Sequence, residues 1–421
     1  METIQLDQGL HQTVLPSGLT VLTEMLPGVR SIAAGIWVRT ASAHEARSKM
    51  GVSHLLEHMV FKGTERRSAR QLALELEVRG GSLDAYTSRD HTNYQAHVLD
   101  EDLSRALDVL TDLTRRPLLR EEDLALERNV VLEEIAQVED TPDDLVYELF
   151  ADRLWPDHPY GYSILGTPDT VRALSAQDLK AVHQSGYYPG NAVVAVAGRV
   201  EHQQVLDLLA REGWMDDAAP APAKPAVAPR PAERGKAHRI ERDTAQVHLV
   251  FGSDTFPYRE SRRFALSIIT NVFGGGMSSR LFQRVREELG LAYAVYAYQQ
   301  FLASAGIAGV YVGTQPATAD QAEAAIREEY RKLAEEGLTE DEVASGRQQL
   351  RGQVMLSLES PVSRMNRLAN FILHQLPYRT LDAVLSEINA VTREQVQALA
   401  AEFFAPERQT MVRLGPDTAT A

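Results

Sequence analysis

The sequence predicts an α+β protein of two similar domains, each a mostly antiparallel β-sheet packed with helices. An Ala/Pro-rich segment, residues 215–238, divides the chain and favours an extended spacer without regular hydrogen bonding. A strand, helices, a strand pair, several helices and a closing strand follow one another on both sides of this segment. We therefore expect domains at 1–214 and 239–421, joined by a linker at 215–238.

Alternating apolar residues and Tyr- and Thr-rich runs indicate strands, whereas apolar residues at helical spacing indicate helices. In the first half these patterns predict strands at 19–26, 31–40, 82–90, 92–99 and 187–198, and helices at 52–64, 67–80, 101–115 and 121–153. In the second half they predict strands at 245–253, 291–301, 305–314 and 409–415, with helices at 260–273, 277–288 and through 317–403.

The composition excludes several function classes. The chain has 58 acidic against 43 basic residues, a net charge of −15, which argues against nucleic acid and anionic membrane surfaces as partners. It has no cysteine, so a disulfide, a thiolate nucleophile and a Cys-ligated zinc are excluded. No apolar stretch is long enough for a membrane span, and the N-terminus does not resemble a signal peptide. We expect a cytoplasmic protein.

The stretch VSHLLEHMVFKGT, residues 52–64, concentrates two histidines and a glutamate within five positions. On a helix, His54 and His58 lie one turn apart on one face, where both imidazoles can bind one cation. Glu57 flanks that face, and its carboxylate could reach a metal-bound water without being a ligand. The alternative is a set of surface or capping residues. A catalytic zinc usually has three protein ligands and one open position, so this interpretation requires a third ligand.

The acidic run ERNVVLEEIAQVED, residues 127–140, supplies candidates for the third ligand. Glu127 and Glu134 are seven positions apart and share one face of a helix, whereas Glu133 points about 100° away. Spacing alone does not choose between Glu133 and Glu134. A solvated acidic helix face is the ordinary interpretation of such a run.

H-x-x-E-H is the inverted zinc signature of the inverzincins. The chain resembles the family of pitrilysin, insulin-degrading enzyme and mitochondrial processing peptidase, in its half-length bacterial form. The passages that carry the resemblance are GVSHLLEHMVFKGT, GGSLDAYTSRDHTNY, HPYGYSILGT, YYPGNAVVAVAGRV and GGGMSSRLFQRVREELGLAY. The resemblance implies one zinc ion per chain, held by His54, His58 and Glu134, which follows His58 by 76 residues.

The resemblance also implies roles for further residues. It makes Glu57 the general base of peptide-bond hydrolysis, Glu127 a carboxylate that assists catalysis, and Glu133 a bystander. It assigns substrate binding and oxyanion support to Arg286 and Tyr293, which are seven positions apart as in the family.

The expected substrate is a peptide or an unfolded protein segment. By resemblance, it pairs as an extra strand with Leu83, Asp84 and Ala85, which contribute mostly backbone groups. Asp84 stands where better-known members carry Asn. The acidic balance favours basic peptides.

The resemblance also bears on assembly. Half-length members pair, so we expect a homodimer that encloses a substrate chamber, and the alternative is a heterodimer with a homologous subunit. The alternative function is a non-catalytic structural or partner subunit of a heterodimeric processing peptidase.

Overall fold

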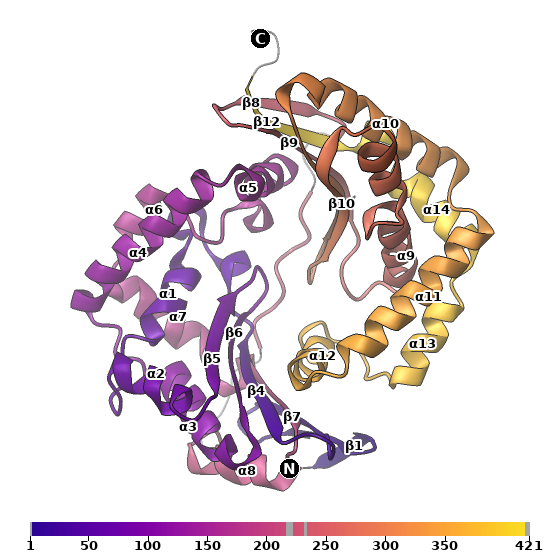
Figure 1. Cartoon of the computed structure of the whole chain (residues 1–421). Helices are drawn as coiled ribbons and strands as arrows, with labels where there is room; N and C mark the ends of the chain where they lie inside the picture. Colours follow the sequence, from indigo (N-terminus) through magenta and orange to yellow (C-terminus); the bar gives the residue numbers. More distant parts are fainter. Residues whose placement is uncertain (1, 216–221, 231–233, 417–421) are drawn as a thin grey trace. The chain divides into compact units, whose positions relative to one another are not determined.

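Two β-sheets, each packed with helices, organise the chain in the computed structural model, which describes residues 2–215, 222–230 and 234–416 (Figure 1). The expected fold class is confirmed: the protein is α+β, with two similar domains of mostly antiparallel sheet and helices. Residues 216–221 and 231–233 of the predicted linker lie outside the described residues.

Each of the two compact units is built from three separate segments of the chain. The first unit comprises Met1–Ile135, Ser163–Ala226 and Leu356–Tyr378, and the second comprises Ala136–Tyr162, Val227–Met355 and Arg379–Ala421. Helix α5 (Pro142–Leu154), from the first half of the sequence, packs on the sheet of the second unit. Helix α12 (Pro361–Leu373), from the second half, packs on the sheet of the first unit. The boundaries expected at 214 and 239 stay a prediction.

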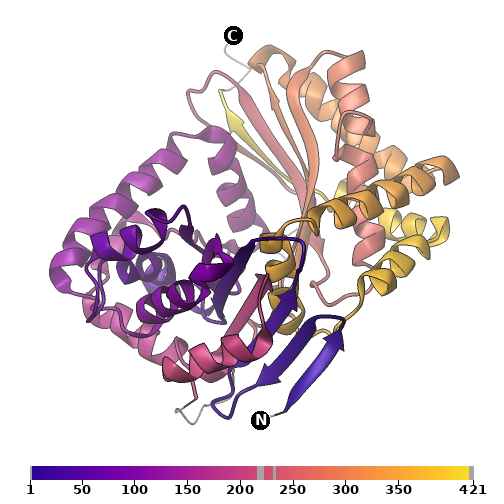
Figure 2. The ribbon, with the colours of Figure 1, turned by 60° about the horizontal axis from the view of Figure 1, so that its bottom comes forward.

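The sheet of the first unit has the strand order β1-β2-β3-β7-β4-β6-β5, and only β3 and β7 pair in parallel. Its strands are β1 (Thr3–Asp7), β2 (Leu10–Val14), β3 (Thr20–Met25), β4 (Ser31–Val38), β5 (Ser82–Thr87), β6 (Thr92–Leu99) and β7 (Ala192–Gly198). The five strands predicted in this half are confirmed, with boundaries that differ by a few residues. The N-terminal strands β1 and β2, drawn in indigo near the N-terminus in Figure 2, were not predicted.

Both faces of this sheet are buried at its central strand β7, which explains why β7 consists only of apolar residues. Val194 and Val196 face the core beneath the helices of the first unit. Val193 and Ala195 face the opposite side, in a cluster that includes Met365 of α12. A strand buried on both faces cannot show the alternation of apolar and polar residues that a half-exposed strand shows.

The helices of the first unit, besides α12, are α1 (Val52–Val60), α2 (Ala69–Glu77), α3 (Leu103–Arg115), α4 (Glu121–Glu139), α6 (Pro168–Ala173), α7 (Ala176–Gly186) and α8 (His202–Arg211). The helical pattern predicted over 121–153 corresponds to two helices, because α4 ends at Glu139 and α5 begins at Pro142. Proline favours the first position of a helix and disfavours the helical conformation in the residue before it. Thr141 accordingly has a non-helical backbone, with ψ of 87°.

The sheet of the second unit has the order β10-β11-β9-β12-β8. Its elements are β8 (Ala237–Glu241), β9 (Val247–Thr255), β10 (Ala292–Phe301), β11 (Gly306–Thr314), β12 (Thr410–Gly415), α9 (Arg263–Gly274), α10 (Ala319–Glu336), α11 (Glu340–Ser357), α13 (Leu381–Asn389) and α14 (Arg393–Phe403). Strand β8 was not predicted. The expected α-helix at 277–288 is a π-helix over Phe282–Glu288. None of the described helices, in either unit, is long and apolar enough to cross a bilayer.

Helix α5 lies against β9 and β12 because the second sheet leaves room for an aromatic ring. Phe150 of α5 is 1% exposed. A Cβ atom on Gly252 of β9 would lie 2.8 Å from the Cζ atom of Phe150, so a side chain there would displace the ring. The glycine in the strand therefore fits the helix that covers it.

We expect Phe150→Ala to lower the free energy of unfolding by about 3–5 kcal/mol, because a buried aromatic ring is lost and a cavity remains. Urea unfolding followed by circular dichroism measures this. Asp144→Ala, at an exposed position of the same helix, is the control and should cost less than about 1 kcal/mol. A cost of Phe150→Ala as small as that of the control would contradict the packing of α5.

Candidate metal centre

Helix α1 is fixed at its N-terminus by a half-buried carboxylate. Glu45 accepts hydrogen bonds from the backbone N–H of Gly51 at 2.9 Å and of Ser53 at 2.7 Å. Burial raises the pKa of Glu45 to about 7, although the two donors oppose that shift. Gly51 has φ of +88°, and a Cβ atom there would lie 2.5 Å from the carbonyl oxygen of Leu165. The backbone conformation and the close contact both require glycine where the helix begins.

The structure brings His54, His58 and Glu134 together, on α1 and α4. The Nε2 atom of His54 lies 3.6 Å from Glu134 Oε2, and the Nε2 atom of His58 lies 3.5 Å from Glu134 Oε1. Each of the three offers one ligand atom, and these atoms all lie within 4.8 Å of one another. Glu133 is exposed and does not belong to this group. Two imidazoles and a carboxylate are a donor set that suits zinc.

Glu127 holds the His58 ring from the side opposite Glu134. Its Oε2 atom lies 3.1 Å from His58 Nδ1, and its Oε1 atom lies 2.6 Å from Lys62 Nζ. Because a carboxylate only accepts, His58 donates its Nδ1–H to Glu127, and its Nε2 atom lies on the side of Glu134. Metal-binding histidines are commonly oriented in this way by a carboxylate. The arrangement therefore fits a metal ion bound by Nε2.

The environment of His54 keeps its ring neutral. Burial, and next the neighbouring His58, lower the pKa of His54 to about 4. The ring is therefore uncharged near pH 7, and a histidine must be uncharged to bind a metal.

Glu57 lies on α1 between the two histidines and is half-buried. Burial raises its pKa, while a hydrogen bond from Thr87 and the nearby His58 lower it. Thr87 Oγ1 donates to Glu57 Oε2 at 2.5 Å. The carboxylate is thus held in one orientation and can accept a proton more readily than an exposed glutamate.

The predicted peptide-binding residues lie on β5, the edge strand of the first sheet. The side chains of Leu83 and Ala85 are partly buried against the core under the helices. Asp84 is exposed, and its Oδ1 atom accepts the backbone N–H of Ala85 at 3.1 Å.

Arg286 and Tyr293 lie together in the second unit. The guanidinium of Arg286 lies 4.5 Å from the ring centre of Tyr293 and 4.6 Å from that of Phe282. Its Nη1 atom donates to the carbonyl oxygen of Tyr293 at 3.2 Å. Tyr293 is 79% exposed, so its ring and hydroxyl are available to a ligand.

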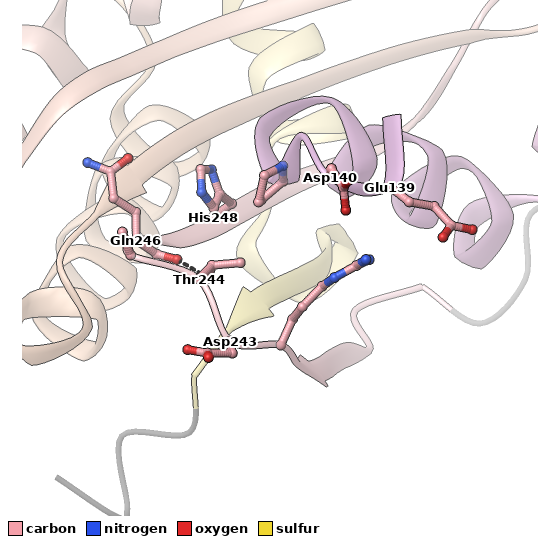
Figure 3. A pocket seen from close by; sticks show the side chains of 9 residues that line it. Glu139, Asp140, Asp243, Thr244, Gln246 and His248 are labelled. Carbon is pink, nitrogen blue, oxygen red and sulfur yellow. Dashed lines mark hydrogen bonds between the residues drawn. The ribbon is translucent and has the colours of Figure 1, made fainter. Parts of the chain in front are cut away.

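A hollow of about 430 Å³ in the second unit is lined by none of the predicted site residues (Figure 3). Three carboxylates, of Glu139, Asp140 and Asp243, surround it with Arg242. His248 at its wall is buried and is bound through Nδ1 to the Tyr311 hydroxyl at 2.8 Å. Acidic side chains alone do not define a ligand site, and we assign none to this hollow.

Three residues that support the centre were not named from the sequence. Lys62 stands four positions after His58, a spacing that could have identified it. Leu83, Ala85 and Thr87 follow one another at every second position of β5. The strand period could therefore have placed Thr87 on the same face as the other two. No local pattern links Glu45 to the start of α1.

The sequence was compared with family profiles. Residues 20–168 match the profile described as insulinase, peptidase family M16, and residues 173–350 match the profile described as peptidase M16 inactive domain. The chain belongs to peptidase family M16. The His54–His58–Glu134 group lies wholly within the residues that match the first M16 profile.

Relatives within the M16 family align over nearly the whole chain. An uncharacterized zinc protease of Streptomyces coelicolor is 39% identical over 97% of this chain and 90% of its own. An uncharacterized zinc protease of Bacillus subtilis is 38% identical over 92% of this chain and 94% of its own. The resemblance that the motifs carried is confirmed.

The fold also matches solved structures. An M16 inactive-domain structure from Pseudomonas fluorescens has a TM-score of 0.89 at 21% identity and covers 97% of this chain and 98% of its own. A protease from Helicobacter pylori has a TM-score of 0.87 at 22% identity and covers 97% and 99%. At this level of identity the likeness concerns the fold alone.

We expect Glu127→Ala to weaken zinc binding by about 10- to 100-fold, because the orientation of His58 is lost. Competition with a chromophoric chelator measures the affinity. Glu133→Ala, on the same helix but outside the ligand group, should leave it unchanged. Equal affinities of the two variants would contradict the orienting role of Glu127.

Proposed function

We propose that the protein is a zinc-dependent endopeptidase that hydrolyses peptide bonds in peptides or unfolded protein segments. One observation carries the proposal. His54, His58 and Glu134 converge on one point, and the carboxylate of Glu57 lies on the same helix as the two histidines. The family membership and the zinc-protease names of the relatives support the same reaction.

When bound, zinc supplies Lewis-acid chemistry, polarising a carbonyl and making a water molecule more acidic. Glu57 takes the proton of the attacking water and passes it to the amine that leaves when the C–N bond breaks. Glu127 keeps His58 in the tautomer whose Nε2 atom can bind the ion. Leu83 and Ala85 offer backbone groups to the peptide strand.

The role of Arg286 and Tyr293 belongs to the same proposal. A cation and a phenol can stabilise the negative oxygen of the tetrahedral intermediate, an effect worth several kcal/mol. We propose that the protein acts as a homodimer that encloses its substrate. The net charge of −15 supports basic peptides as its substrates.

We expect Glu57→Gln to keep about one zinc ion per chain and to lower kcat on a quenched fluorescent basic peptide by at least about 100-fold, because the proton acceptor is lost. Metal content and peptide cleavage are measured on the same preparations. Glu133→Gln is the matched control, since it removes an exposed carboxylate of α4.

Two outcomes would count against the proposal. Undiminished cleavage by Glu57→Gln would remove Glu57 from the reaction. If the wild-type chain binds zinc and cuts no peptide by itself, the alternative of a non-catalytic partner subunit is favoured, and a second homologous chain should restore cleavage.

The hydrogen bond from Thr87 to Glu57 predicts different values of kcat for two substitutions of Thr87. Thr87→Val removes the hydroxyl at constant shape and should lower kcat roughly tenfold, equivalent to about 1.4 kcal/mol, with little change in KM. Thr87→Ser keeps the donor and should restore most of the activity. A purely structural role would instead leave Ser and Val equally impaired or equally active.

A further inference from the structure

The free edge of β5 presents a defined set of backbone groups. The N–H of Ser88 donates to the carbonyl oxygen of His91 at 2.9 Å where the β5–β6 hairpin closes. Paired residues in an antiparallel ladder alternate between bonded and non-bonded pairs. Counting back from that pair, the N–H and C=O groups of Leu83, Ala85 and Thr87 point away from β6. No strand covers this edge in the described sheet.

The side chain of Asp84 accepts a hydrogen bond from one of these edge N–H groups. The N–H of Ala85 donates to Asp84 Oδ1 at 3.1 Å, so the carboxylate lies over the backbone position where a peptide carbonyl would bind. Asp84 is exposed and forms no ion pair with any residue in the described part of the chain. Its charge is therefore available to an incoming group.

Asp84 and Tyr86 share the face of β5 that is turned away from α1 and Glu57. Side chains alternate along a strand, and those of Leu83, Ala85 and Thr87 face the core and Glu57. Tyr86 is 39% exposed, and its hydroxyl lies 3.4 Å from His91 Nε2. The two rings meet edge to face, with centres 5.9 Å apart, so the Tyr86 ring is held in place.

We propose that Asp84 and Tyr86 form a subsite for a Lys or Arg side chain of an extended peptide that pairs with β5. The inference rests on the proposed function and names its substrate class. A peptide strand bonded to Leu83, Ala85 and Thr87 places the side chain opposite Asp84 on Asp84's own face. The two Cβ atoms are then about 4.5–5.5 Å apart, a distance at which opposite charges attract. The exposed ring of Tyr86 can attract the same cation.

Because the Asp84 carboxylate lies at the N–H of Ala85, binding of a basic side chain by Asp84 also affects how the peptide pairs with β5. A Lys or Arg side chain draws Asp84 towards itself, which frees the N–H of Ala85 for a peptide carbonyl. An uncharged side chain leaves the carboxylate bound to that N–H and one edge hydrogen bond unmade. A carboxylate in the peptide adds repulsion to this loss. The preference thus follows from one contact on one strand, independently of the net charge of the chain.

The test measures binding without turnover. Glu57→Gln protein loaded with zinc is titrated into labelled peptides of equal length that carry Lys, norleucine or Glu at one position, scanned along the peptide. Fluorescence anisotropy gives Kd. At one position we expect Lys to bind roughly two- to fivefold more tightly than norleucine, and Glu more weakly. This preference should shrink at high salt.

Second-site variants assign the preference to Asp84. Adding Asp84→Asn should remove the advantage of Lys, and Asp84→Glu should retain most of it. Asp169→Asn is the matched control, since it removes the same charge from a side chain on α6 that is 98% exposed. Circular dichroism confirms that each variant is folded.

The outcomes separate this inference from the proposed function. If no position prefers Lys, or if Asp84→Asn keeps the preference, the subsite is overturned even where Glu57-dependent cleavage supports the peptidase. If the wild type cuts none of these peptides while Lys binding still depends on Asp84, the peptidase proposal fails and the subsite stands. Absence of binding by every peptide would overturn the subsite.

Discussion

The contact between the His58 Nδ1 atom and Glu127 is the interaction on which the candidate metal centre depends. It joins α1 to α4 and orients the His58 ring so that Nε2 lies beside Glu134, as a metal ligand at this position would require. Glu127 is almost fully buried, and its Oε1 atom lies 2.6 Å from Lys62 Nζ. A buried carboxylate without such a partner would be costly to keep charged. The His54–His58–Glu134 group is therefore part of a larger set that includes Glu127 on α4 and Lys62, two residues beyond the end of α1.

The candidate metal centre lies on helices that are held firmly in place. The N-terminus of α1 is held by Glu45, and the apolar side chains of α1 are wholly buried beside those of the sheet. The opposite face of that sheet is covered by α12, which comes from the other half of the sequence. A metal site requires ligand atoms held within fractions of an ångström, and helices packed on a two-sided core provide that rigidity.

The sequence predicted those parts of the structure that depend on local periodicity. The spacing of His54 and His58 placed two ligands on one helix face, and the strand pair that ends in β5 and β6 was visible in its Tyr- and Thr-rich runs. The choice between Glu133 and Glu134 was left open by spacing, because it depends on how α4 turns against α1. The exchange of α5 and α12 was not predictable for a related reason. An amphipathic helix shows that it has a buried face but does not show which sheet will cover it.

Thr87 links the two functional parts of the first unit. Its backbone belongs to the free edge of β5, where a peptide would pair, and its hydroxyl binds the carboxylate of Glu57 at 2.5 Å. A peptide that adds to this edge would therefore take its register from the strand that also orients the carboxylate of Glu57. Because a strand can shift only in steps of two residues without turning its side chains over, the edge admits few registers. In the subsite that we propose, Asp84, three positions before Thr87 in β5, then binds one side chain of the peptide in a register fixed relative to Glu57. In the two proposals, the preference for a basic side chain and the orientation of Glu57 thus depend on Asp84 and Thr87, three positions apart on one edge strand.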